Sequence, residues 1–195
     1  MSTESGETEA VTWQSYSLGD AESHGSEQVW PILKEGERIG TYTRNADGDR
    51  LDSAYGEWVV DASADRRISA TLSDGRVFST TASDRDKIFR AKELSVDFGG
   101  AAAAGKLVCE GSTNYVIEDA RTGQKWGQFT GASRGVRHAE VQFDTDEGRA
   151  LGEAEKIFLV YSARRVLESR MVSTSLVLSV CLLLLVAYTI WLWIV

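Results

Sequence analysis

The amino-acid sequence predicts a mainly β protein: a small antiparallel barrel or sandwich followed by an amphipathic helix and one C-terminal transmembrane helix. Three observations predict this class: short alternating segments over most of the chain, a change to helical spacing near Gly148, and a long uncharged C-terminal run. We therefore divide the chain into a disordered polar tail (1–10), a β domain (11–148), an amphipathic juxtamembrane helix (149–170) and a transmembrane anchor (171–195).

Composition excludes several classes of protein. The 195 residues suit one domain with an accessory segment, and 43% hydrophobic residues are too many for wholesale disorder. A formal net charge of −8 argues against nucleic-acid binding by bulk positive charge. Cys109 is assigned to the β domain and Cys181 to the anchor, so we expect no disulfide between them.

The β domain is predicted from short segments that alternate in polarity or are rich in β-branched and aromatic residues. Ile68–Leu72 and Arg76–Thr80 flank a Ser-Asp-Gly turn and predict a hairpin. The other clear segments are Glu57–Asp61, Leu94–Phe98, Gly105–Glu110, Asn114–Glu118 and Ala139–Phe143. Roughly ten such strands indicate a sandwich or a barrel. A short helical turn is expected within 83–92.

Two segments share one glycine pattern. Gly36–Tyr42 and Gly123–Phe129 both read Gly, three residues, Gly, one residue, aromatic, and each follows an apolar strand. The first glycine suits the positive φ of a tight turn, and the second permits close backbone approach in the returning strand. The match is either a coincidence or the mark of repeated hairpins in one barrel.

Helical spacing begins after Gly148. One face of this segment carries Leu151, Ala154, Ile157, Phe158 and Tyr161. Such a stripe predicts a helix packed on the β domain. Because no proline or glycine occurs from Glu153 to Val195, this helix is expected to continue into the tail.

The predicted anchor is the segment Met171–Val195, which contains no charged residue and no histidine. A helix of this length reaches roughly 37 Å, against about 30 Å of bilayer hydrocarbon. Tyr188, Trp191 and Trp193 lie near its end, where aromatic rings favour the lipid–water boundary. These features predict a membrane span; the alternative is a helix buried inside a soluble core.

Three arginines, Arg164, Arg165 and Arg170, precede the uncharged run. Because positive charge stays on the cytoplasmic side, the N-terminal part is expected in the cytoplasm of a tail-anchored, single-pass protein of the cell membrane. The same side chains could contact anionic lipid headgroups, each contributing about 1 kcal/mol near the surface. Orientation alone and headgroup contact both remain open.

Catalytic motifs are weak. Gly131–Gly135 has the letters of a nucleophile elbow around Ser133, but the one histidine that follows, His138, comes too soon and the flanks predict strands. Gly100–Lys106 resembles a phosphate-binding loop, yet no helix is expected after it. The acidic segment 45–52 is interpreted as a solvated turn. We expect no cofactor and no metal.

One hairpin carries a resemblance. The run from Tyr115 to Phe129, Tyr-Val-Ile-Glu-Asp-Ala-Arg-Thr-Gly-Gln-Lys-Trp-Gly-Gln-Phe, resembles a hairpin of the LURP-one-related, tubby C-terminal and phospholipid scramblase superfamily. This resemblance implies a β-barrel threaded by a hydrophobic helix, with phosphoinositide binding or membrane association. The threading helix would be either 149–168 or the final span. No basic cluster matches the family's headgroup site, so no binding residue carries over.

Together these observations predict a non-catalytic, tail-anchored membrane protein whose β domain binds membrane lipid or a membrane protein partner. One alternative is a subunit or structural cap of a membrane protein assembly. The other is a membrane-bound serine hydrolase that uses Ser133 and His138. Nucleic acid is not an expected partner.

Overall fold

The computed structural model describes residues 13–100, 103–111, 113–131 and 139–194. These residues form thirteen β-strands, one 3-10 turn and two α-helices. The strands are β1 (Gln14–Leu18), β2 (Glu22–His24), β3 (Glu27–Lys34), β4 (Glu37–Asn45), β5 (Gly48–Ser53), β6 (Gly56–Asp61), β7 (Arg67–Thr71), β8 (Val77–Ala82), β9 (Glu93–Phe98), β10 (Ala104–Cys109), β11 (Asn114–Asp119), β12 (Lys125–Thr130) and β13 (Glu140–Phe143). The helices are η1 (Ile88–Arg90), α1 (Asp146–Ala150) and α2 (Glu153–Ile194).

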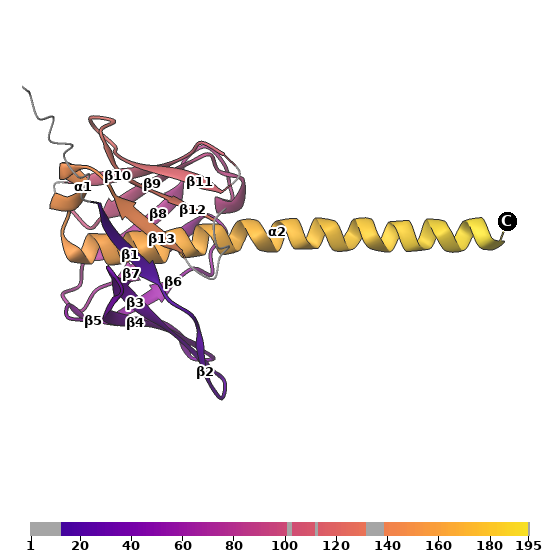
Figure 1. Cartoon of the computed structure of the whole chain (residues 1–195), viewed down its shortest axis with the longest axis horizontal. Coiled ribbons are helices and arrows are strands. Elements are labelled where there is room, and N and C mark those ends of the chain that lie inside the picture. Colours follow the sequence, from indigo (N-terminus) through magenta and orange to yellow (C-terminus); the bar gives the residue numbers. More distant parts are fainter. Residues whose placement is uncertain (1–12, 101–102, 112, 132–138, 195) are drawn as a thin grey trace, which may run out of the picture.

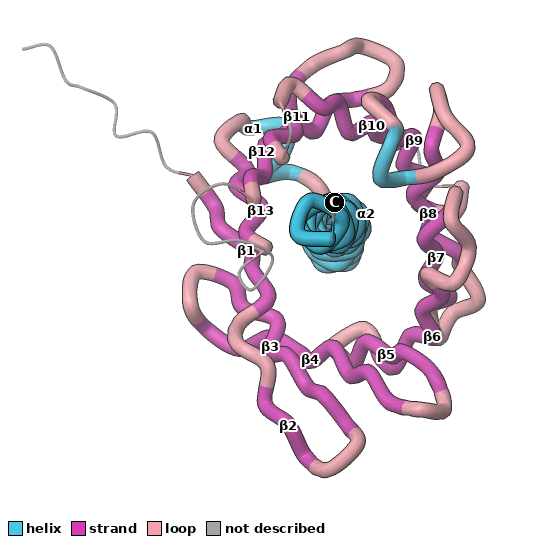
Figure 2. The backbone as a smooth tube through the Cα atoms, turned by 90° about the vertical axis from the view of Figure 1, so that its right-hand side faces the viewer, coloured by secondary structure: helices cyan, strands magenta, loops and turns pink. Residues whose placement is uncertain are grey.

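Twelve of the described strands close into an antiparallel barrel. From β3 to β13 each strand pairs with its neighbour in sequence, and β1 pairs with both β13 and β3, which closes the ring. Strand β2 pairs with β3 outside the ring, as part of the hairpin that projects from the barrel wall in Figure 2. Of the two predicted architectures, barrel and sandwich, the barrel is the correct one.

The predicted strands are confirmed, and the sequence undercounted them. The hairpin at 68–80 is β7 and β8, and the expected helical turn is η1. Much of the acidic segment 45–52, interpreted as a solvated turn, is strand β5 instead. Only Leu51 of this strand is buried, so β5 lacks the apolar signal by which the other strands were recognised.

The N-terminal part of α2 runs along the barrel axis (Figure 2). Twelve strands about 4.8 Å apart and tilted by about 40° enclose a barrel with a diameter of roughly 24 Å. A helix with its side chains fills about 10–12 Å of that width. The remaining space holds one layer of inward-facing side chains. The strand side chains alone would therefore not fill the lumen, and the central helix completes the packed core.

Burial on all sides corrects the expected amphipathic helix. From Lys156 to Arg164 every residue of α2 is buried, polar ones included. The ring of Phe158 meets Phe78 and Phe98 edge-on, with centroids 5.6 and 6.4 Å apart. The barrel wall surrounds the helix, so no face of this segment remains for solvent. The apolar stripe seen in the sequence is only part of the buried surface.

The repeated glycine pattern is confirmed in both hairpins, β3–β4 and β11–β12. Gly36 and Gly123 have positive φ angles of 87° and 71° at the turns. A Cβ atom on Gly40 would collide with the carbonyl oxygen of Asp52, and one on Gly127 would collide with that of Gln142. Each second glycine therefore permits a close backbone contact with the next strand along the barrel.

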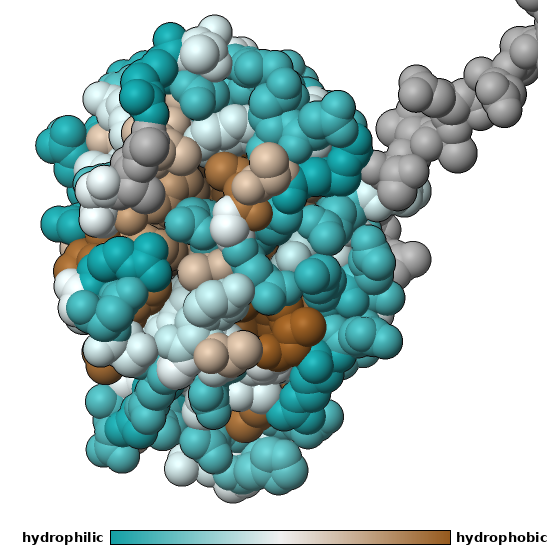
Figure 3. Space-filling model, turned by 90° about the vertical axis from the view of Figure 1, so that its left-hand side faces the viewer, coloured by the Kyte–Doolittle hydropathy of each residue, from teal (hydrophilic) through white to brown (hydrophobic). Residues whose placement is uncertain are grey.

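Helix α1 lies against β12 at the end where the chain turns into the lumen, here called the entry end. The Thr145 side chain caps α1 by accepting a hydrogen bond from the Gly148 backbone N–H (3.1 Å). Gly148 lies directly against the Trp126 carbonyl, where a Cβ would not fit. Hydrophilic residues predominate on this face of the molecule (Figure 3).

Helix α2 continues without interruption to Ile194 and projects from the opposite end of the barrel, here called the exit mouth (Figure 1). Within the described part of the chain, no helix combines the length and the apolar character that crossing a bilayer requires. The predicted transmembrane helix over 171–195 is therefore wrong. The uncharged run is not an independent element, because it is the second half of a helix whose charged first half fills the barrel.

Candidate functional site: the exit mouth and the projecting arm

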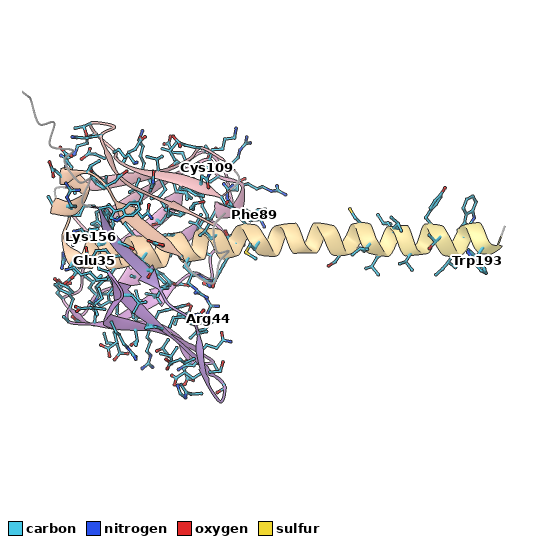
Figure 4. All side chains as sticks on the ribbon, in the orientation of Figure 1. Glu35, Arg44, Phe89, Cys109, Lys156 and Trp193 are labelled. Atoms are coloured by element: carbon cyan, nitrogen blue, oxygen red, sulfur yellow. The ribbon has the colours of Figure 1, made fainter. Side chains whose placement is uncertain are left out.

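The part of α2 outside the barrel, residues 171–194, is here called the arm. Its side chains are described at Met171, Ser179, 181–186, 188–191 and Trp193, and these residues are exposed. Figure 4 shows the arm extending away from the barrel, with Trp193 near its far end. At about 1.5 Å per residue the arm reaches roughly 36 Å.

The arm carries apolar side chains on all of its faces. Leu182, Leu183, Leu184, Leu185 and Val186 are consecutive, and each is between 50% and 70% exposed. Successive residues of an α-helix are rotated by about 100°, so five of them cover the whole circumference. A helix that docks into one protein groove needs only one apolar stripe, whereas this segment is apolar on all faces.

Aromatic residues gather towards the far end of the arm. The rings of Tyr188 and Trp191 stack with centroids 6.3 Å apart. Trp193 is 92% exposed. Tyrosine and tryptophan side chains favour the boundary between an apolar and a polar phase, because each has an apolar ring and a polar group.

Charged side chains gather around Glu168 at the exit mouth. Its carboxylate accepts hydrogen bonds from Arg164 Nε (2.8 Å), Arg165 Nη1 (2.8 Å) and Arg44 Nη2 (3.2 Å). Arg44 comes from the end of β4, far from α2 in the sequence, and also lies 3.5 Å from Asp49. Three guanidinium groups thus share two carboxylates.

Aromatic rings support these cations. Trp30 stacks on Tyr42 with centroids 5.0 Å apart. The Arg164 guanidinium lies 4.4 Å from the centroid of Trp30, and that of Arg44 lies 5.4 Å from it. Cation–π contacts at such distances are attractive, particularly where water is excluded. They fix the positions of both guanidinium groups.

The structure brings the three sequence-predicted arginines to the same end of the barrel. Arg164 is buried, Arg165 is half-buried, and Arg170 donates a hydrogen bond to the Ala91 carbonyl (2.7 Å) while lying over the ring of Tyr115. Their contact with lipid headgroups stays a prediction. Sequence reasoning missed Arg44, because β4 meets Glu168 only where α2 passes through the barrel, and these two residues are 124 positions apart.

A second charged cluster lies at the entry end. Glu153 accepts hydrogen bonds from Lys34 Nζ (2.9 Å), Tyr16 Oη (3.3 Å) and Tyr55 Oη (3.4 Å). The hydrogen bond from Lys34 is the main cause that lowers the pKa of Glu153. Burial raises the pKa of Tyr16 to about 12. This cluster fixes the start of α2 to the barrel wall.

Lys156 is a buried cation in the first turns of α2 (Figure 4), and its Nζ lies 5.7 Å from the ring centroid of Tyr16 in that cluster. Its Nζ donates to Gln14 Oε1 (2.8 Å) and to the Arg149 carbonyl (2.7 Å). Burial lowers the pKa of Lys156. Through these two hydrogen bonds Lys156 holds β1 and α1 to the central helix.

The weak catalytic motifs gain no support from the described geometry. Ser133 and His138, the residues of the alternative hydrolase, lie outside the described residues. The phosphate-loop-like segment is followed by strand β10 and not by a helix. Among the residues that the structure describes, no group of His, Cys, Asp and Glu side chains could hold a metal ion.

These features define a β-barrel filled by its own helix, with an exposed apolar arm beyond the exit mouth. No family model, no curated protein and no solved structure matches this chain. The resemblance of the Tyr115–Phe129 hairpin to the LURP-one-related, tubby and scramblase superfamily stays a prediction.

Proposed function

We propose that this chain is a non-catalytic protein that associates with membrane lipid through its arm, while the filled barrel holds the arm in a fixed direction. The observation that carries this proposal is the exposure of apolar side chains on every face of the arm at Leu182–Val186. Burying such surface in an apolar phase is favourable by about 25 cal/mol per Å². The cytoplasmic placement of the barrel stays a prediction.

The filled lumen supports a holding role for the barrel. The centre that could enclose a ligand in a barrel of this width is occupied by Phe158 and its neighbours from α2. Lys156 at the entry end and Glu168 at the exit mouth connect α2 to the wall. The direction of the arm is thus determined by contacts along the length of the barrel.

Flotation with neutral phosphatidylcholine vesicles tests the proposal. The full chain is expected to float with the vesicles, and the double variant Leu184→Glu/Leu185→Glu to lose at least about tenfold in partitioning, because each buried leucine contributes roughly 1.5–3 kcal/mol. Val59→Glu is the matched control: Val59 lies on the barrel wall and is 64% exposed, close to the 66% of Leu184.

The control variant should float like the native chain. If all three proteins float equally, or if none of them floats, lipid association through the arm is contradicted. Cross-linking without vesicles tests the alternative in which the arm binds protein instead of lipid. If the native chain forms discrete oligomers through the arm and does not float, a protein partner covers these side chains and the lipid proposal fails.

A further inference from the structure

The exit mouth contains more guanidinium groups than carboxylates. Arg44, Arg164 and Arg165 carry three positive charges against the two negative charges of Asp49 and Glu168. Arg164 is only 6% exposed, and its Nη1 has no hydrogen-bond partner among the described residues. A buried guanidinium N–H without an acceptor is costly, and an anion is the partner that removes this cost.

We propose that the exit mouth binds one phosphate-class anion through Arg44, Arg164 and Arg165. Planar guanidinium groups suit phosphate oxygens, because each can donate two parallel hydrogen bonds. Burial lowers the pKa of Arg164 although Glu168 lies 2.8 Å from its Nε, so the desolvation of this guanidinium outweighs the attraction of that carboxylate. Arg44 and Arg165 are partly exposed, which leaves the cluster accessible from outside the barrel.

The position of the cluster connects it with the arm. Arg165 and Glu168 lie within two turns of Met171, where the exposed part of α2 begins. If the arm is in lipid, a phosphate of an anionic headgroup would lie at the depth of the mouth; this source of the anion rests on the proposed function. Free phosphate is the other source, and it requires no lipid.

Thermal unfolding of the full chain in neutral detergent, with inorganic phosphate as the probe, tests the site. Chloride at matched ionic strength controls for screening. Phosphate is expected to raise the melting temperature, and Arg44→Gln and Arg165→Gln each to weaken the apparent affinity about tenfold. The matched control is Arg50→Gln, because Arg50 is an exposed arginine on the next strand and forms an ion pair with the exposed Glu57.

Glu168→Gln gives the sharpest test, because it removes the carboxylate that competes for the same donors. This variant is expected to be less stable than the native chain without phosphate, and to gain more from phosphate than the native chain does. If Glu168 has only a structural role, the variant is less stable without phosphate but is not stabilised by phosphate more than the native chain is. Equal effects of phosphate and chloride, or equal affinities of Arg44→Gln and Arg50→Gln, would overturn the anion site.

Vesicles distinguish the two sources. If phosphatidic acid in phosphatidylcholine vesicles strengthens binding of the native chain and of Arg50→Gln but not of Arg44→Gln, the anion is a lipid headgroup. If inorganic phosphate binds and phosphatidic acid adds nothing, the site takes free phosphate. The Leu184→Glu/Leu185→Glu variant should lose vesicle binding and still bind phosphate, so failure of the lipid proposal is distinguishable from failure of the anion site.

Discussion

At the scale of single residues, charged side chains connect α2 to the barrel at both ends. Glu153 joins three strand or turn residues at the entry end, and Glu168 joins Arg44 at the exit mouth. Partly buried charge-assisted hydrogen bonds of this kind are stronger than exposed ion pairs. They place the helix along the axis and determine where the arm begins.

Glu153 makes the free energy of unfolding depend on pH. The pKa of this carboxyl group is lower in the folded chain than the ordinary value of 4.5, mainly because of Lys34. A carboxylate with a depressed folded pKa stabilises the fold above its unfolded pKa, and this contribution is lost as pH falls through the folded pKa. Glu153→Gln should cost about 1 kcal/mol at pH 7 and little at pH 3.

Urea unfolding in neutral detergent, followed by near-ultraviolet circular dichroism between pH 3 and 7, measures this difference. Glu155→Gln, on the same turn of α2, is the control and should follow the native pH dependence. If the cost of Glu153→Gln is the same at pH 3 and pH 7, the cluster around Glu153 does not stabilise the fold through its charge.

At the scale of elements, close contact between strands depends on glycines in two hairpins. Gly127 in β12 lies against the Gln142 carbonyl, so Gly127→Ala must displace a backbone and should destabilise the chain by about 2 kcal/mol or more. At Gly111 the nearest atoms to a new Cβ are those of Asn114, at an ordinary 3.7 Å.

Gly111→Ala is therefore expected to change the free energy of unfolding by less than about 0.5 kcal/mol. Denaturant unfolding of both variants measures the contrast. A Gly127→Ala chain as stable as Gly111→Ala would show that β12 and β13 do not approach as closely as described.

The sequence predicts individual elements where their signal is local. Alternation identified β7 and β9, because every second residue faces the core, and the glycine spacing identified both hairpins. Strand β5 was not predicted, because Asp49, Arg50 and Asp52 are charged and only Leu51 is buried. The continuity of α2 was correctly expected from the lack of proline and glycine.

At the scale of the whole molecule, the closure of the ring and the site could not be predicted. The pairing of β1 with β13 joins residues more than 120 positions apart, and nothing local indicates it. Lys156 and Arg164 resemble surface residues in sequence, because the groups that bury them come from distant strands. The uncharged tail predicted the apolar character of the arm, and the lack of proline and glycine predicted its helical continuation, but neither indicates that the first half of α2 lies inside the barrel.

The proposed lipid association requires that the arm enters an apolar phase while the barrel stays outside it. The native Cys181 lies exposed on the arm, so a Cys109→Ser chain can carry one environment-sensitive fluorophore at Cys181. With phosphatidylcholine vesicles, the emission of this fluorophore is expected to shift to the blue and to be protected from iodide quenching. An emission that stays unshifted and fully quenchable after vesicles are added would contradict the proposed lipid association.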